Sequence, residues 1–340
     1  MRHGRTGLSA LRAAVEAELA GVSLRALEQA AAGLSRRYRA GGRAATHAPA
    51  ANERLAYIAT RMPATAAALA VVLAETDRVL ASAPATLLDL GSGPGTSLWP
   101  ALDIWPSLTR ATLVDRDAGM LEIGQRLWTR RDSPSSLEIE WRNAPLTGSD
   151  PLPSHDLVLL SYTIGELEAR ERETLCDRAR AAARHAVIVV EPGTPAGYAR
   201  VLDVRAQGIV AGLHVLAPCP HDAGCPLAPL NDWCHFAARV ERSRAHRLIK
   251  GGALGWEDEK FSYVVLSTHA PDRRARARIL RHPIKGSGHV NLRLCAADGL
   301  RDVTVGRRSD EYRVARRAEW GDRWPDADTS QEGPDHRSLE

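Results

Sequence analysis

Short apolar runs alternate with longer helical patterns between about residue 84 and residue 193, and this alternation constrains the fold more than any other feature. The apolar runs are ATLLDL, ATLVDRD, SLEIEWRN, HDLVLLSY and HAVIVVEPG, and the stretches between them include AGMLEIGQRLWTR and ELEARERETLCDRARAAA. Strands that alternate with helices form a parallel sheet with helices on both faces, and ligands bind at the carboxyl ends of the strands. The sequence therefore predicts a doubly wound, Rossmann-like α/β domain.

The segments on either side of this alternation divide the chain into four predicted regions. Residues 1–80 are rich in Ala and Leu, with Arg and Glu at helical spacing, which predicts an N-terminal helical region. Residues 81–205 form the predicted α/β core, and residues 206–320 combine a cysteine-containing loop, late strand patterns and an Arg-dense segment. Residues 321–340 are polar, which predicts a disordered tail.

Composition excludes several classes of protein. The apolar fraction of 44% supports packed cores, and five cysteines are too few for a disulfide-rich secreted scaffold. No segment approaches the roughly 18 uninterrupted apolar residues of a membrane span. The N-terminal segment MRHGRTGLSALRAAVEAEL contains no apolar signal-peptide core. We therefore expect a cytoplasmic protein that does not associate with membranes.

A glycine loop follows the first predicted strand in LLDLGSGPGTS. Gly91, Gly93 and Gly95 allow a sharp turn and let backbone N–H groups approach a ligand. Asp89 ends the strand just before the loop, where its charge disfavours a pyrophosphate and suits a cationic or amino-bearing ligand. Asp115 ends the second predicted strand, at the position that binds ribose hydroxyl groups in nucleotide-binding folds.

These features resemble the class I S-adenosylmethionine-dependent methyltransferases. The resemblance implies that the glycine loop passes beneath the methionine part of S-adenosylmethionine (SAM), that Asp115 holds its ribose and that Asn143 faces its adenine. DNA and RNA amino-methyltransferases usually carry an Asp/Asn-Pro-Pro-aromatic tetrad after the fourth strand, whereas this chain has SYTI at residues 161–164. Cofactor binding is therefore better supported than methyl transfer. Tyr162 and Glu166 are the best-placed catalytic candidates, with packing and helix capping as the alternative for both.

Four of the five cysteines lie in the C-terminal part of the chain with the spacing C-x5-C-x8-C-x60-C. Three of them occupy a proline-rich loop with little capacity for its own core, so a metal or cluster bound by thiolates would order it. Four soft ligands fit tetrahedral zinc or an iron–sulfur cluster, with His221 and His235 as substitute ligands. Unrelated buried thiols are the alternative. The candidate ligands are Cys219, Cys225, Cys234 and Cys295.

Longer motifs of the chain resemble the Rsm22 family. These motifs are APCPHDAGCPL, DWCHF, HRLIKGGALGWEDEKFSYVVLS, SGHVNLRLC and ARRAEWGDRWP, and the resemblance runs from about residue 50 to residue 325. The family comprises the mitochondrial small-ribosomal-subunit Rsm22 proteins, the methyltransferase-like protein 17 group and bacterial homologues. The resemblance implies a class I methyltransferase fold, a [4Fe–4S] cluster held by the four candidate cysteines, and association with the small ribosomal subunit and its rRNA during assembly.

Arginine dominates the basic residues, and its local excess indicates a candidate RNA surface. Only three of the 45 basic residues are lysines. A GC-rich coding bias is the alternative explanation for this excess of arginine. Two locally basic stretches, ARVERSRAHRLIK and DRRARARILRHPIKGSGH, follow the cysteine loop, and phosphate contacts from such residues supply sequence-independent affinity. A solvated helix face is the alternative. With the family resemblance, the second stretch predicts RNA contacts from Arg273, Arg274, Arg276, Arg278, Arg281 and Lys285.

The sequence therefore predicts a SAM-binding protein that acts on the small ribosomal subunit in assembly or translation. Methylation of rRNA is the second hypothesis, because the fold is implied but the amine-binding tetrad is absent. A small-molecule or protein methyltransferase with a structural zinc site is the third, and the large basic C-terminal half argues against it. We expect a monomer away from the ribosome.

Overall fold

The computed structural model describes residues 5–39, 50–131, 136–272 and 274–324. The chain forms two compact units. The larger unit contains residues 1–217 and 233–271, and the smaller unit contains residues 218–232 and 272–340. The chain therefore leaves the larger unit after residue 217, returns to it at residue 233 and leaves it again after residue 271.

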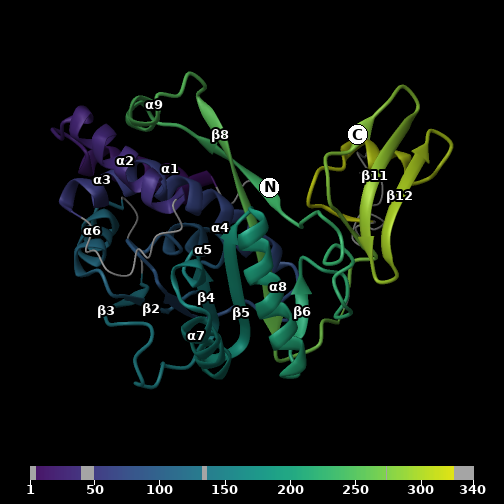
Figure 1. Cartoon of the computed structure of the whole chain (residues 1–340), viewed down its shortest axis with the longest axis horizontal. Coiled ribbons are helices and arrows are strands. Elements are labelled where there is room, and N and C mark those ends of the chain that lie inside the picture. The colour runs from purple at the N-terminus through teal and green to yellow at the C-terminus, as the bar shows by residue number, and fades with distance from the viewer. Residues whose placement is uncertain (1–4, 40–49, 132–135, 273, 325–340) are drawn as a thin grey trace, which may run out of the picture. The chain divides into compact units, whose positions relative to one another are not determined.

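The larger unit is built on an eight-stranded sheet with the order β3-β2-β1-β4-β5-β8-β6, and β7 pairs with β8 (Figure 1). Its parallel part contains β1 (Thr86–Leu90), β2 (Arg110–Asp115), β3 (Glu138–Asn143), β4 (His155–Ser161) and β5 (Ala183–Pro192). The five predicted strands are confirmed. The strand order reverses between β1 and β4, and such a switch point opens a crevice for ligands at the carboxyl ends of these strands.

The sheet is mixed rather than wholly parallel. β8 (Trp256–Ser267) runs antiparallel to β5, and both β6 (His214–Ala217) and β7 (Phe236–Glu241) pair antiparallel with β8. The sequence predicts a late strand in KFSYVVLST but not its place beside β5. An antiparallel strand needs no crossover helix, so the alternation of strands and helices gives no sign of it.

The predicted N-terminal helices are part of the larger unit. They are α1 (Arg5–Glu18), α2 (Leu24–Arg39), α3 (Ala51–Thr60) and α4 (Met62–Asp77). Buried residues of α1 to α4 share one hydrophobic cluster with residues of α5 (Leu98–Ile104), α6 (Ala118–Thr129) and α9 (Arg244–Lys250). This shared cluster joins the N-terminal helices to helices of the α/β core.

Two further helices cover the middle of the sheet. α7 (Ala169–Ala182) contacts β4 and β5, and α8 (Pro195–Val210) contacts β5, β6 and β8. Among the described residues no single helix is long and apolar enough to cross a membrane, although the bent pair α3–α4 meets that test of length and composition as a pair.

The smaller unit contains a five-stranded sheet with the order β10-β11-β9-β13, and β12 pairs with β11. Its elements are β9 (Ala277–Ile279), β10 (Ile284–Lys285), β11 (His289–Ala296), β12 (Gly299–Gly306), α10 (Tyr312–Arg317) and β13 (Arg323–Trp324). Val290, Leu292 and Leu294 alternate along β11 and are buried in its core. β13 places part of the predicted tail in the sheet, and residues 325–340 lie outside the described part of the chain.

Candidate functional site

The glycine loop lies at the carboxyl end of β1, beside the switch point of the sheet. Gly91, Gly93 and Gly95 have φ angles of 79°, 53° and 69°, which lie in the left-handed region that favours glycine. A Cβ atom on Gly91 would lie 2.4 Å from Oγ1 of Thr163, so the loop packs against the segment after β4. Nothing described lies within 4 Å of a Cβ position on Gly93, so the middle of the loop is open to a ligand.

Asp89 is a buried acidic group in β1, with 1% of its surface exposed. Its Oδ2 accepts a hydrogen bond of 2.5 Å from Oγ of Ser97, and its Oδ1 has no hydrogen-bond partner among the described residues. Burial raises the pKa of Asp89 from 3.8 to about 7; the Ser97 bond lowers it and the nearby Asp115 carboxyl raises it further. A buried carboxyl oxygen without a partner is costly, so a cationic or amino group on a ligand would stabilise it.

Asp115, the last residue of β2, contacts both the glycine loop and β3. Its Oδ2 accepts a hydrogen bond of 2.8 Å from the N–H of Gly93, and its Oδ1 accepts one of 2.8 Å from the N–H of Asp117. Burial raises the pKa of Asp115, and these two hydrogen bonds lower it. Asn143, opposite Asp115 in the β2–β3 register, donates a hydrogen bond of 3.1 Å from Nδ2 to the Asp115 carbonyl oxygen. The structure thus brings the predicted cofactor residues together at one edge.

Tyr162 follows β4 in a strained backbone conformation. With φ of 56°, it is the only non-glycine residue with positive φ in the described part of the chain, and such strain clusters at functional sites. The Tyr162 hydroxyl donates a hydrogen bond of 3.1 Å to Oε1 of Glu259 in β8, which forms an ion pair of 3.3 Å with Arg61. Burial and the Glu259 carboxylate raise the pKa of Tyr162 well above its ordinary value. At neutral pH the hydroxyl therefore donates a hydrogen bond and cannot act as a base.

Glu166 ends the short 3-10 helix η2 (Ile164–Glu166) that follows Tyr162. Partial desolvation raises the pKa of Glu166, whose side chain is 37% exposed, and the guanidinium of Arg116, 3.7 Å away, lowers it. A carboxyl group with a raised pKa is a suitable candidate for proton transfer. The structure therefore places both predicted catalytic candidates at the carboxyl end of β4.

Two acidic residues at this edge were not predicted. Glu191 in β5 is fully buried, and its Oε2 accepts a hydrogen bond of 2.7 Å from Nε of Arg200. Glu191 ends the last apolar run, so the carboxyl-end rule could have identified it. Glu259 had no such signal, because β8 reaches this edge only after the chain returns from the smaller unit.

The four candidate cysteine ligands are divided between the two units. Cys219, Cys225 and Cys295 belong to the smaller unit, where Sγ of Cys295 lies 3.8 Å from Nε2 of His221. Cys234 belongs to the larger unit. Across the residues that the structure describes, no group of three or more His, Cys, Asp or Glu side chains could hold a metal ion. The four-cysteine site therefore stays a prediction.

Arg278, a predicted RNA contact, has a structural role in the smaller unit. Its exposed fraction is 4%. Its guanidinium donates hydrogen bonds of 2.8 Å to the carbonyl oxygen of Pro218 and 2.9 Å to that of Gly321. Because this side chain is buried, it does not offer its charge to a phosphate. The pattern of basic residues in the sequence does not show that Arg278 is buried and its neighbours are more exposed.

The other predicted RNA contacts vary in exposure. Arg274 forms an ion pair with Asp222, and Arg281 forms one with Asp232, so both charges are partly offset within the smaller unit. The exposed members of the set are Arg276 and Lys285, while Arg273 lies outside the described residues.

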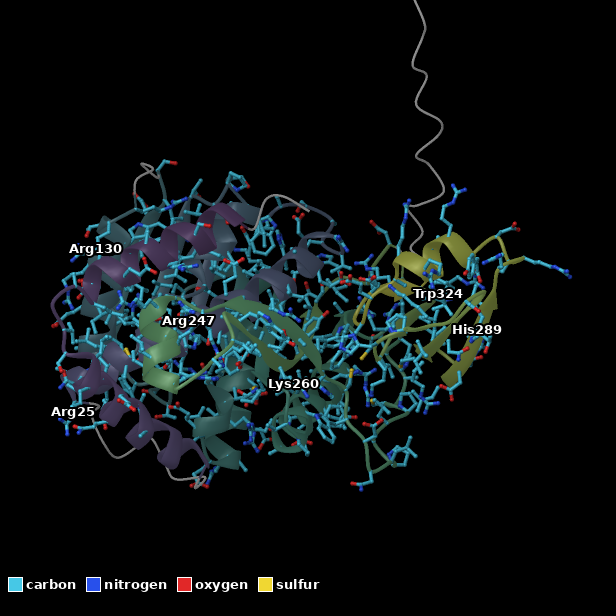
Figure 2. All side chains as sticks on the ribbon, turned by 90° about the horizontal axis from the view of Figure 1, so that it is seen from above. Arg25, Arg130, Arg247, Lys260, His289 and Trp324 are labelled. Atoms are coloured by element: carbon cyan, nitrogen blue, oxygen red, sulfur yellow. The ribbon has the colours of Figure 1, made fainter. Side chains whose placement is uncertain are left out.

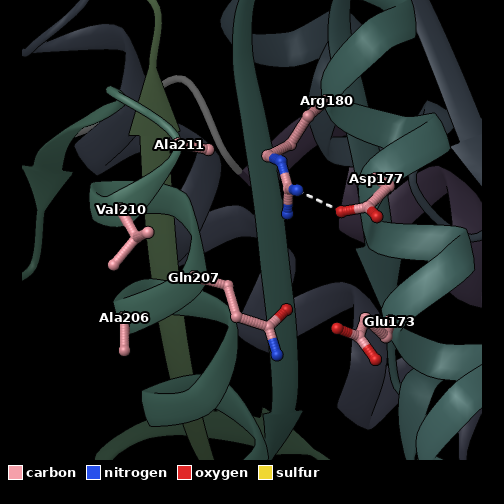
Figure 3. A pocket seen from close by; sticks show the side chains of 7 residues that line it. All are labelled: Glu173, Asp177, Arg180, Ala206, Gln207, Val210 and Ala211. Carbon is pink, nitrogen blue, oxygen red and sulfur yellow. Dashed lines mark hydrogen bonds and ion pairs between the residues drawn. The ribbon is translucent and has the colours of Figure 1, made fainter.

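A shallow groove of about 420 Å³ lies between α7 and α8, away from the glycine loop (Figure 3). Arg180 lies just before β5, and Val210 lies just before β6, so the groove is at the opposite edge of the sheet from Glu191. It is separate from the candidate cofactor site. Its lining residues are Glu173, Asp177, Arg180, Ala206, Gln207, Val210 and Ala211.

The order of the sheet, the left-handed glycine loop and the two acidic residues define the chain as a Rossmann-like α/β protein. A family model described as "Mitochondrial small ribosomal subunit Rsm22" matches residues 51–325. The chain therefore belongs to the Rsm22 family.

Two curated relatives illustrate this membership. The human "Ribosome assembly protein METTL17, mitochondrial" is 31% identical over 80% of this chain and 62% of its own length. The "Rsm22-cox11 tandem protein 2, mitochondrial" of Schizosaccharomyces pombe is 24% identical over 80% of this chain and 43% of its own length. The chain thus spans less than two thirds of the length of either relative.

Two solved structures are distant matches to this chain. Magnesium protoporphyrin IX methyltransferase from Synechocystis PCC 6803 with bound SAH is 10% identical, with a TM-score of 0.40 over 70% of this chain and 94% of that one. A putative RNA methyltransferase from Pyrococcus horikoshii is 12% identical, with a TM-score of 0.37 over 59% of this chain and 80% of that one.

Proposed function

We propose that this protein binds SAM at the carboxyl edge of β1 and β2 and acts on the small ribosomal subunit, as an assembly or translation factor. The family match over residues 51–325 carries the ribosomal part of the proposal. The human relative is named a ribosome assembly protein, which also supports the ribosomal part of the proposal. The glycine loop and its acidic neighbours support the cofactor part.

The residues at this edge fit SAM. Asp89 has a buried oxygen without a partner, which suits the positively charged methionine part of the ligand. Gly93 leaves open space where a side chain would stand, so the backbone can lie against the ligand. Asp115 would hold the ribose hydroxyl groups, and Asn143 would lie on the adenine side. When bound, SAM supplies a methyl group that is activated by its sulfonium charge.

Methyl transfer to rRNA is the second candidate function, and the strained Tyr162 favours it. In this role the Tyr162 hydroxyl, whose proton is donated to Glu259, would orient the acceptor by accepting a hydrogen bond, and Glu166 would take up a proton. A comparison of rRNA methylation between a deletion strain and a strain carrying Tyr162→Phe tests it. Loss of one modified nucleotide in both strains would support transfer, and an unchanged set of modifications would contradict it.

We also propose that Cys219, Cys225, Cys234 and Cys295 bind an iron–sulfur cluster. The donor set supports this, because four thiolates suit such a cluster and Cys295 already lies near a second donor, His221. Protein purified without oxygen should be brown and contain iron and sulfide, and Cys295→Ser should lose both. Colourless protein that holds zinc would instead support the zinc alternative and contradict the cluster.

Association with the ribosome is tested by sedimentation of a cell lysate followed by crosslinking to RNA. The protein should sediment with small subunits or their precursors, and the crosslinks should fall in small-subunit rRNA. Sedimentation as a free protein in growing cells, without crosslinks to rRNA, would contradict the proposal. A deletion strain should also accumulate immature small subunits.

A further inference from the structure

A long hairpin of the larger unit presents an aromatic and basic surface that the cofactor site does not use. We call residues 239–258 the α9 arm: it contains the end of β7, helix α9, a turn and the start of β8. Ser243 caps α9 by accepting a hydrogen bond from the N–H of His246, and Gly251 ends it with φ of 60°. These two residues therefore set where α9 begins and ends.

One carboxylate holds the arm in shape. Nη2 of Arg242, Nε2 of His246 and Nζ of Lys250 lie 2.6, 3.1 and 2.8 Å from the carboxylate oxygens of Glu257. Burial acts to raise the pKa of Glu257, but these three contacts outweigh it and hold the pKa well below its ordinary value. Glu257 therefore ties three side chains of the arm together on its inner face.

The outer face carries a stacked pair of flat side chains. The guanidinium carbon of Arg239 lies 3.6 Å from the ring centroid of Trp256, within the range of a cation–π contact. Asp258, opposite Arg239 in the β7–β8 register, accepts a hydrogen bond of 2.6 Å from Nε of Arg239 and fixes its orientation. The Trp256 side chain remains 40% exposed, although burial of an indole is favourable.

The outer face of α9 adds uncompensated positive charge. Arg244, Arg247 and Leu248 lie at helical spacing i, i+3 and i+4, so they share one face, and Figure 2 shows Arg247 on this helix. Leu248 is 48% exposed, and Leu254 in the following turn is 57% exposed. In the described part of the chain, neither Arg244 nor Arg247 forms an ion pair, in contrast to Arg239, Arg242 and Lys250.

We propose that the α9 arm binds a single-stranded segment of RNA, with a base stacked on the Arg239–Trp256 pair and phosphates held by Arg244 and Arg247. Single strands are bound by exposed aromatic rings, on which bases stack, together with cations that follow the backbone. The positive charge of α9 complements phosphates, and the flat Arg–Trp pair suits a nucleobase better than an aliphatic peptide. This inference rests on the proposed action on the small subunit, and it identifies unpaired RNA as the contacted form.

Binding of a fluorescent 12-nucleotide oligouridine to the full chain tests the arm. Trp256→Leu should weaken binding at least fivefold, while Trp256→Phe should retain most of the affinity because it keeps a stacking ring. Arg244→Glu with Arg247→Glu should weaken binding at least tenfold and flatten its salt dependence. Arg170→Glu, a single exposed reversal on α7, is the control for a charge reversal away from the arm and should change affinity less than twofold.

The outcomes separate this inference from the proposed function. The proposal that the arm binds RNA would be wrong if both arm variants bound oligouridine as tightly as wild type and had the same thermal stability. Equal affinity for a duplex RNA of the same length would overturn the preference for unpaired bases. Arm variants that bind oligouridine normally but lose the small subunit would assign the arm to a protein partner instead. Failure of the wild-type protein to sediment with small subunits would refute the proposed function itself.

Discussion

The free energy of unfolding of the ligand-free protein should depend on pH because of Asp89, and Asp89→Asn should remove this contribution. The pKa of Asp89 rises from 3.8 in the unfolded chain to about 7 in the folded protein, chiefly because of burial. The folded state therefore binds this proton more tightly than the unfolded chain does. The resulting stabilisation is fully present below about pH 4 and is lost as the pH rises through about 7.

The size of the effect follows from the same two values. At about 1.4 kcal/mol for each pH unit, the interval from 3.8 to about 7 corresponds to about 4 kcal/mol. Asp89→Asn keeps an oxygen that can accept the hydrogen bond from Ser97 but cannot ionise. Relative to wild type, its free energy of unfolding should therefore increase by about 3 kcal/mol between pH 5 and pH 8.

Urea unfolding of both proteins at pH 5, 6, 7 and 8 measures this difference. Other titrating groups are common to both proteins, so their contributions largely cancel. Asp150→Asn, which removes an exposed carboxylate, serves as the control for a surface change. Saturating SAM should abolish the pH dependence of the difference, because a bound cation stabilises the ionised form of Asp89. A difference that stays constant within about 0.5 kcal/mol without ligand would refute the reasoning.

Three further predictions test individual contacts. Gly91→Ala places a Cβ atom 2.4 Å from Thr163 at a φ of 79°, so it should lower the free energy of unfolding by about 2 kcal/mol or more in urea unfolding. Arg278→Met should destabilise the smaller unit by about 3 kcal/mol because two buried carbonyl oxygens lose a charged donor, whereas the exposed Arg276→Met should have little effect. Glu257→Gln should accelerate amide hydrogen exchange in α9 at least tenfold, and unchanged exchange would contradict its role as the centre of the arm.

The parallel half of the sheet and the site at its edge were predictable from local sequence. Each strand from β1 to β5 is a short apolar run, and the glycines and acidic residues stand directly at strand ends. The rule that parallel strands end at one edge then brings Asp89 and Asp115 together.

The rest depends on contacts between distant parts of the chain. β8 joins the sheet after an excursion into another unit, so Glu259 reaches Tyr162 across 97 residues of sequence. All six basic residues from Arg273 to Lys285 were predicted RNA contacts, but Arg278 is buried. Arg274 is paired with Asp222, which precedes it by 52 residues. Local charge counts do not reveal such pairing, because burial and long-range ion pairs are decided by tertiary packing.

Calorimetric titration of the ligand-free protein with SAM tests the central claim most directly. The wild-type protein should bind one SAM per chain, and Asp115→Ala should bind it at least tenfold more weakly, because a half-buried acceptor for the ribose is lost. Asp150→Asn, away from the edge, should bind SAM as the wild type does. Absence of SAM binding by the folded wild-type protein, or equal affinity in Asp115→Ala, would contradict the account.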